Sequence, residues 1–179
     1  PPYQTFTTQN FPLESGPTLP HATLAYATSG RRPTAPPILT CTAFSANHDD
    51  LAYLRAAGAA LGPNNRWIIH TEMLGNGRST SPSNSPADFA GPNFPPLSIR
   101  DNVRLQKLLL DHLGVNHIYA VIGASMGGQQ ALQWTVSYPE IVQRAAVLVG
   151  SAKATPHVQL SLNALANCIR SDPDFNDGH

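Results

Sequence analysis

Cysteine is scarce in this chain of 179 residues, which has only Cys41 and Cys168. Two cysteines are too few for a disulfide framework, and neither has cysteine or histidine neighbours at zinc-binding spacing. No apolar run approaches the ~18 residues of a membrane-spanning helix. The first ten residues, PPYQTFTTQN, lack the basic and apolar regions of a signal peptide. We therefore expect a cytoplasmic protein with no metal site, no bound cofactor and no membrane partner.

Charged residues are also few, at 12% of the chain, where roughly 25% is usual. The 11 Lys and Arg residues balance the 11 Asp and Glu residues, so the formal net charge is 0. Nothing in this balance favours nucleic acid or an anionic membrane surface as a partner. The hydrophobic fraction of 41% is enough for a sizeable core, and the length suits one domain. The composition indicates a globular domain that acts on a small molecule.

The predicted elements alternate strands with helices. Residues 3–8 and 23–28 alternate in polarity and are expected to pair antiparallel at one edge of a sheet. Further strands are predicted at 38–42, 66–70, 117–122 and 144–149, and helices at 49–61, 98–113, 129–137 and 157–169. Short apolar strands without alternation are typical of strands buried on both faces. The order predicts an α/β fold with a doubly wound, mostly parallel sheet and helices on both faces.

The sequence Gly123-Ala124-Ser125-Met126-Gly127 is a GxSxG motif between a predicted strand and a predicted helix. In that context the serine lies on a sharp turn that projects its hydroxyl above the sheet, and the glycines let the backbone fold tightly. The N–H of Met126 then points to where a tetrahedral oxyanion would form. Ser125 is the candidate nucleophile. The alternative is that Ser125 only caps a helix after a glycine-rich turn.

Two loops flank this motif in the predicted topology. The first, TCTAFSANHDD at residues 40–50, follows a predicted strand, and its backbone at 43–45 is the candidate for a second oxyanion N–H. A plain strand-to-helix loop is the alternative. The second, residues 71–97, is long and rich in Gly, Ser, Pro and Asn. Connections of more than ~12–15 residues are uncommon in compact domains and are often functional.

The residues 94–134, FPPLSIRDNVRLQKLLLDHLGVNHIYAVIGASMGGQQALQW, resemble the homoserine O-acetyltransferase family of the α/β-hydrolase superfamily. Four segments look more like the ester-hydrolase side branch of that family, which includes esterases that cleave short acetate esters. They are AFSANHDDLAYL at 43–54, LGNGRSTSPSN at 74–84, MGGQQALQW at 126–134 and GSAKATPH at 150–157. The resemblance covers residues 20–179 and implies an α/β-hydrolase fold.

The resemblance implies site residues at matching positions. Ser125 matches the nucleophile, and Met126 and Phe44 match the donors of the oxyanion hole. Residues 78–84 match the loop that lines the entrance to the site, and Ser45 and Arg78 are the candidate substrate-binding residues. Two residues depart from the pattern: Glu72 stands where Asn is usual, and Ala46 stands where glycine is common.

The resemblance also implies an Asp and a His that follow a helical lid, in the order Ser, Asp, His. None of the 7 histidines lies on the expected late loop. We therefore expect the N-terminal portion of the fold, with residues 1–156 forming core and 157–179 beginning the lid. The C-terminal remainder, in the same chain or as a second chain, would supply the Asp and the His. His48 or His70 as a substitute base is the less favoured alternative.

The residues and the resemblance together predict a serine-dependent acyl-ester enzyme that hydrolyses a small, acetate-type ester. The first alternative is an acetyl-CoA-dependent O-acetyltransferase acting on a homoserine-like or secondary-metabolite alcohol, with acetyl-CoA as co-substrate. The second alternative is a non-catalytic remnant of the fold. The sequence does not fix the oligomeric state, and a homodimer is compatible with it.

Overall fold

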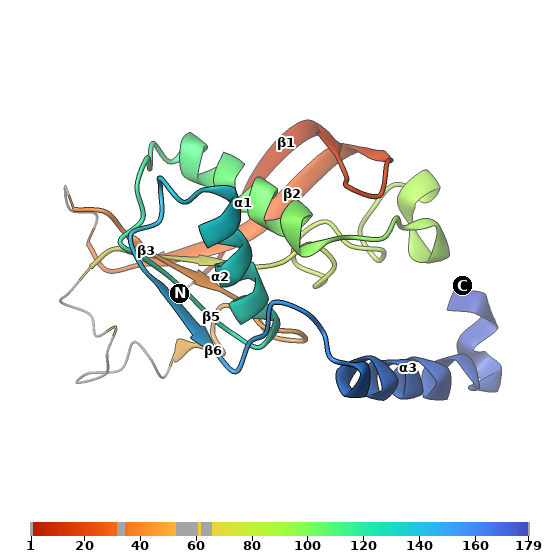
Figure 1. Cartoon of the computed structure of the whole chain (residues 1–179). Coiled ribbons are helices and arrows are strands. Elements are labelled where there is room, and N and C mark those ends of the chain that lie inside the picture. The colour runs from red at the N-terminus through yellow and green to blue at the C-terminus, as the bar shows by residue number, and fades with distance from the viewer. Residues whose placement is uncertain (1, 32–34, 53–60, 62–65, 179) are drawn as a thin grey trace.

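A six-stranded sheet organises the chain (Figure 1), in the strand order β1-β2-β4-β3-β5-β6. The computed structural model describes all residues except 1, 32–34, 53–60, 62–65 and 179. The strands are β1 Gln4–Pro12, β2 Thr18–Ser29, β3 Ile38–Cys41, β4 Ile68–Thr71, β5 Ala120–Ala124 and β6 Ala145–Leu148. The pairings among β4, β3, β5 and β6 are parallel, so the mostly parallel sheet predicted from the sequence is confirmed.

Strands β1 and β2 form the predicted antiparallel pair at one edge of the sheet. Gln4 pairs with Tyr26 and Pro12 with Thr18, and β2 continues antiparallel onto β4. Both strands are longer than the alternation predicted. The reason is that the pairing extends to a tight connection in which the Gly16 N–H donates to the carbonyl of Leu13.

The central strands β3 and β4 are buried along their whole length, as predicted for strands covered on both faces. In the parallel pairing of β3 with β5, Cys41 lies opposite Gly123. The carboxyl ends of these two strands therefore meet at one edge of the sheet. The loop that follows Cys41 and the turn that follows Gly123 start side by side.

Helices α1 (Ile99–His112) and α2 (Met126–Ser137) pack against one face of the sheet (Figure 1) and close the main hydrophobic core. Helix α1 starts at a capping box. The Ser98 hydroxyl accepts from the Asp101 N–H at 3.0 Å, and the Asp101 carboxylate accepts from the Ser98 N–H at 3.0 Å. Gly114, at a φ of 68°, ends the helix in the left-handed conformation that glycine tolerates.

The opposite face of the sheet carries a second, smaller apolar cluster of Ile38, Leu61, Ile68 and Ala120. Neighbouring residues in a strand point to opposite faces, so Leu39 and Ile69 face the main core while Ile38 and Ile68 face this cluster. The helix predicted at 49–61 lies mostly outside the described residues, which include only 49–52 and 61 of that span.

The loop at 71–97 is tied to the rest of the molecule by many hydrogen bonds. The Ser79 hydroxyl accepts from the Ala25 N–H at 3.0 Å, and the Thr80 N–H donates to the Thr23 carbonyl at 2.9 Å. Both bonds join the loop to β2. Two short 3-10 helices, η2 Ala87–Phe89 and η3 Gly91–Asn93, shape its second half. The loop is therefore a fixed wall beside the sheet.

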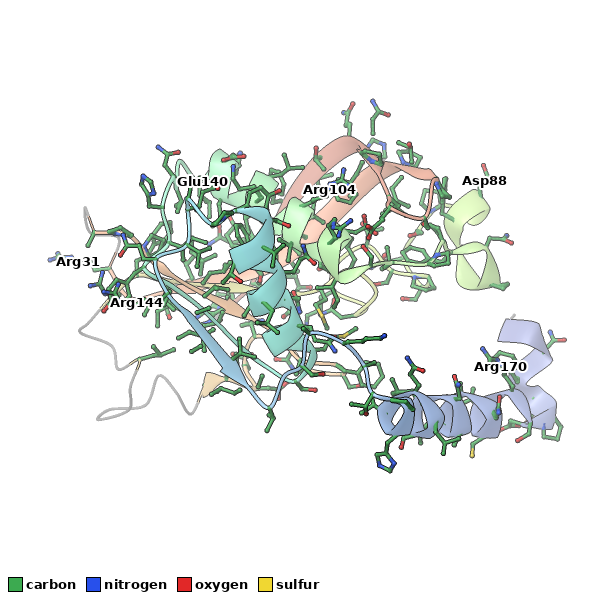
Figure 2. The ribbon with its side chains drawn as sticks, viewed as in Figure 1. Arg31, Asp88, Arg104, Glu140, Arg144 and Arg170 are labelled. Atoms are coloured by element: carbon green, nitrogen blue, oxygen red, sulfur yellow. The ribbon has the colours of Figure 1, made fainter. Side chains whose placement is uncertain are left out.

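Helix α3 (Pro156–Arg170) confirms the predicted helix at 157–169 and stands away from the sheet (Figure 1). Figure 2 shows its side chains pointing outward, with Arg170 far from Arg144, which precedes β6. The helix buries none of its residues, and η4 (Pro173–Gly178) follows it. Its exposed apolar residues are Val158, Leu160, Leu162, Leu165 and Ile169. Within the described part of the chain, no helix is both long and apolar enough to cross a membrane.

Candidate active site

Ser125 lies at a strained turn between β5 and α2. Its φ of 53° and ψ of −118° fall in a region that residues with a side chain rarely adopt. The side chain is exposed and makes no capping bond to α2. The Ser125 N–H donates to the carbonyl of Leu148 at the end of β6, at 2.9 Å. The turn thus presents the hydroxyl outward instead of using it as a helix cap, which is the geometry that the nucleophile interpretation requires.

The glycines on either side of Ser125 are required by close backbone contacts. A Cβ at Gly123 would lie 2.0 Å from the carbonyl oxygen of Gly127, and a Cβ at Gly127 would lie 2.4 Å from that of Cys41. No side chain fits at such distances. The tight turn that the GxSxG motif predicted is therefore present, and the first turn of α2 packs directly on the ends of β5 and β3.

Of the two predicted oxyanion donors, Met126 lies at the start of α2 and Phe44 lies in the loop after β3. Met126 is the first residue of α2, so its N–H has no intrahelical partner. Phe44 lies in a turn in which the Ala46 N–H donates to the Ala43 carbonyl at 3.1 Å, and Ser45 has a φ of 56°. The side chain of Phe44 is exposed. Oxyanion binding by these two N–H groups stays a prediction.

A cavity of about 550 Å³ opens at the same edge. Four of the predicted site residues line it: Phe44, Ser45, Arg78 and Met126. Ser125 itself is not among the lining residues that the structure describes, and it lies next to Met126 at the exposed turn. The rest of the lining is mixed, with Met73, Leu74, Leu97 and Ile99 as apolar residues and Asn47, Asn76, Ser98 and Asn102 as polar ones.

A buried carboxylate, Glu72, organises one wall of this cavity. Its Oε1 atom accepts from His48 Nδ1 at 2.7 Å, from the His48 backbone N–H at 3.1 Å and from Arg78 Nη1 at 3.1 Å. Its Oε2 atom accepts from Asn76 Nδ2 at 2.7 Å. Sequence reasoning marked Glu72 only as a departure from the family pattern. Glu72 comes directly after β4, at the carboxyl end of a parallel strand, and this position was the one indication that it belongs to the site.

The two histidines considered as a substitute base are both engaged in structural contacts. His48 is 2% exposed and bonded to Glu72. His70 is fully buried, and its ring nitrogens lie 2.7 Å from the Thr40 hydroxyl and 2.8 Å from the Ser29 hydroxyl. These contacts favour a structural role for both residues.

Replacing Glu72 by glutamine is expected to destabilise the protein. A glutamine side chain presents an NH₂ group to one of the donors that now converge on the carboxylate, and it leaves Arg78 without a counter-charge. Arg78 is 35% exposed and Glu72 is fully buried, so the main cost is that of leaving a buried donor unsatisfied, about 1–3 kcal/mol. Urea denaturation measures the loss. The control is Glu14→Gln, which removes an exposed pair with Arg100 and should cost no more than ~0.5 kcal/mol. Equal losses in both variants would contradict this account of Glu72.

Cys41 lies at the end of β3, close to the nucleophile turn, but it is not a competing nucleophile. Burial raises the pKa of its thiol to about 12, so the reactive thiolate is absent at neutral pH. Among the described residues, no three His, Cys, Asp or Glu side chains are placed to hold a metal ion. The serine hydroxyl and the backbone N–H groups at this edge are the groups that the nucleophile interpretation uses.

The comparisons with known proteins agree with this geometry. An ethyl acetate hydrolase of Pseudomonas veronii is 35% identical over 99% of this chain and 52% of its own length. A homoserine O-acetyltransferase of Methanococcoides burtonii is 36% identical over 94% of this chain and 38% of its own. The crystal structure of an acetylester hydrolase from Corynebacterium glutamicum superposes with a TM-score of 0.95, at 36% identity, over 99% of this chain and 52% of that one.

The chain thus spans about half the length of the esterase and 38% of the length of the homoserine O-acetyltransferase. The resemblance read from the sequence, to homoserine O-acetyltransferases and their esterase branch, is confirmed by these relatives. The family model for the alpha/beta hydrolase fold matches residues 36–170. This chain belongs to the α/β hydrolase fold family.

Proposed function

We propose that this chain carries the nucleophile and the oxyanion hole of an acyl-ester enzyme that hydrolyses small, acetate-type esters. The observation that carries the proposal is the positive φ of Ser125 at the start of α2, where the helix N-terminus and the neighbouring 43–46 turn lie beside a cavity. The relatives of which this chain spans about half include an ethyl acetate hydrolase and an acetylester hydrolase.

In this proposal the Ser125 Oγ atom attacks the ester carbonyl carbon. The carbonyl oxygen becomes an oxyanion that accepts from the N–H groups of Met126 and Phe44. Collapse of the tetrahedral intermediate releases the alcohol and leaves an acetyl group on Ser125. Water then attacks the acyl-enzyme, which releases acetate and restores the hydroxyl.

The proton transfers need a base. In this family a histidine held by an acidic residue takes the proton from the serine and delivers it to the leaving alcohol. We propose that both residues come from the part of the fold by which the relatives exceed this chain, joined to it or as a second chain. Residues 157–179, which include the outward-facing α3, would then begin the lid over the site.

The residues of the cavity wall favour an uncharged substrate. The charge of Arg78 is paired with Glu72, so this wall does not offer a free cation to a carboxylate. The apolar side chains of Leu97, Ile99 and Met126 suit short alkyl or acyl groups. Arg78 and Ser45 would contact the bound ester through their polar atoms.

The alternative is an O-acetyltransferase that uses acetyl-CoA, which the homoserine O-acetyltransferase relative favours. Hydrolysis and transfer share the acyl-enzyme and differ only in what accepts the acyl group. The experiment incubates the full-length protein with a ¹⁴C-acetyl ester or with ¹⁴C-acetyl-CoA to form a labelled acyl-enzyme. The label is then followed into acetate, formed with water, and into esters of added alcohols such as homoserine. The proposal predicts acetate as the main product and no acylation by acetyl-CoA. Acylation by acetyl-CoA followed by transfer to an alcohol would favour the alternative, and no acylation by either donor would favour a non-catalytic remnant.

A further inference from the structure

Behind the nucleophile turn, a chain of buried side-chain hydrogen bonds joins α1, α2 and the end of β3. Trp134 Nε1 lies 2.8 Å from Gln106 Oε1, and Gln106 Nε2 lies 2.6 Å from Gln130 Oε1. Gln130 Nε2 lies 2.9 Å from the carbonyl oxygen of Thr42. All three side chains are fully buried. All three residues lie in the segment 94–134 that carries the family resemblance, but no sequence pattern linked their side chains to one another.

The direction of every bond in this chain is fixed by Trp134. The indole N–H can only donate, so Gln106 must accept through its oxygen. Its amide nitrogen then donates to the Gln130 oxygen, and the Gln130 nitrogen is left to donate to Thr42. The Cys41 S–H also approaches Gln106 Oε1, at 3.7 Å. The network therefore has one orientation, which ends in an N–H bond to a backbone carbonyl.

That carbonyl belongs to the residue immediately before the 43–46 turn, where the second oxyanion N–H is proposed. Thr42 lies past the end of β3, and its own hydroxyl has no hydrogen-bond partner among the described residues. A Cβ at Gly127 would lie 3.0 Å from the same Thr42 oxygen, so helix α2 is in close contact with it. The Gln130 amide is thus the polar side-chain contact that ties this peptide to α2.

We propose that Gln130 is a positioning residue that holds the turn bearing the Phe44 N–H in register with the Met126 N–H. Both donors are then set by one rigid element, because α2 carries Met126 at its first position and Gln130 one turn later. This inference rests on the proposed function, since it needs Phe44 as an oxyanion donor. Gln130 is buried and acts through Thr42, without touching the substrate.

The test compares Gln130→Met with Gln133→Met in the full-length protein. Methionine keeps the length of glutamine and removes the donor, and Gln133 lies on the same helix but bonds Ser137 instead. Loss of a whole oxyanion donor lowers kcat by about 10²–10³-fold. In Gln130→Met the Phe44 N–H would be displaced and not lost, so we expect kcat to fall about 10- to 100-fold. We expect KM to change less than about threefold, because the ground-state ester makes weaker use of the oxyanion hole. Gln133→Met should keep the wild-type kcat.

A second variant, Gln130→Glu, keeps the proposal testable if methionine prevents folding. A protonated glutamic acid can donate to the Thr42 carbonyl and accept from Gln106, whereas the ionised form cannot donate. The ratio of its kcat to that of the wild type should therefore rise as the pH falls through the pKa of the introduced carboxyl. Urea denaturation of Gln130→Glu over the same pH range shows whether the protein stays folded, because ionisation of a buried carboxyl also destabilises the fold. The expected result is a kcat ratio that changes at pH values where the variant remains fully folded.

The outcomes separate the inference from the proposed function. An active wild type with kcat of Gln130→Met within twofold of normal would overturn the inference alone. A flat pH ratio for Gln130→Glu would do the same. A wild type that neither hydrolyses esters nor becomes acylated on Ser125 would overturn the proposed function, and the role of Gln130 with it.

Discussion

Replacement of Ser125 by alanine is expected to lower ester turnover in the full-length protein by about 10⁴-fold or more, since the members of a catalytic triad act as a unit. The variant retains the oxyanion N–H groups and the cavity, so substrate binding should change little. Steady-state hydrolysis of an acetate ester measures the loss. The matched control is Ser45→Ala, which removes a hydroxyl at the cavity wall and should cost far less than the change at Ser125.

The same position offers a test of the strained backbone. At a φ of 53° a side chain is unfavourable and glycine is not, a difference of about 1 kcal/mol or more. Ser125→Gly should therefore be as inactive as Ser125→Ala but more stable in urea denaturation. If alanine and glycine at this position gave equal stability, the left-handed geometry of the turn would be contradicted.

The largest expected effect on stability comes from Gly123→Ala. The new methyl group would lie 2.0 Å from the Gly127 carbonyl oxygen and 2.8 Å from the Gly128 nitrogen, and both are backbone atoms. The turn and the start of α2 would have to move away from β5. We expect a loss of more than ~3 kcal/mol in the free energy of unfolding, at the upper end of what overpacking costs.

A graded control is Gly128, in the first turn of α2. A Cβ at Gly128 meets its nearest neighbours, Gly150 Cα and Val147 Cγ1, at 3.2 Å, a separation that a small shift relieves. Gly128→Ala should therefore destabilise much less than Gly123→Ala when both are measured by urea denaturation. The reverse order would mean that the elbow is not packed as described.

The parts of the fold that sequence reasoning predicted are those fixed by local chemistry. The GxSxG spacing encodes the tight turn because the steric demand at Gly123 comes from Gly127, within five residues. The demand at Gly127 comes from Cys41 and Thr42 at the end of β3, so it depends on the pairing of the strands. The start of α1 was also predictable, since Ser98 and Asp101 cap the helix reciprocally over three residues. The alternation in β1 and β2 indicated an antiparallel pair, and apolar strands separated by helices indicated a parallel sheet.

The rest depends on contacts between residues far apart in the chain. Glu72 receives donors from His48 and Arg78, and Gln130 reaches Thr42 across 88 positions. A buried polar residue identifies its partner only when the sheet order brings the two segments together. The position of the 43–46 turn beside α2 likewise follows from the pairing of β3 with β5, which no local pattern encodes.

The most direct test of the account is covalent labelling of the full-length protein with a fluorophosphonate probe, read out by peptide mass mapping. The account predicts one adduct per chain, on Ser125, and none in Ser125→Ala. An unlabelled wild type, or an adduct that maps to another residue and persists in Ser125→Ala, would contradict it.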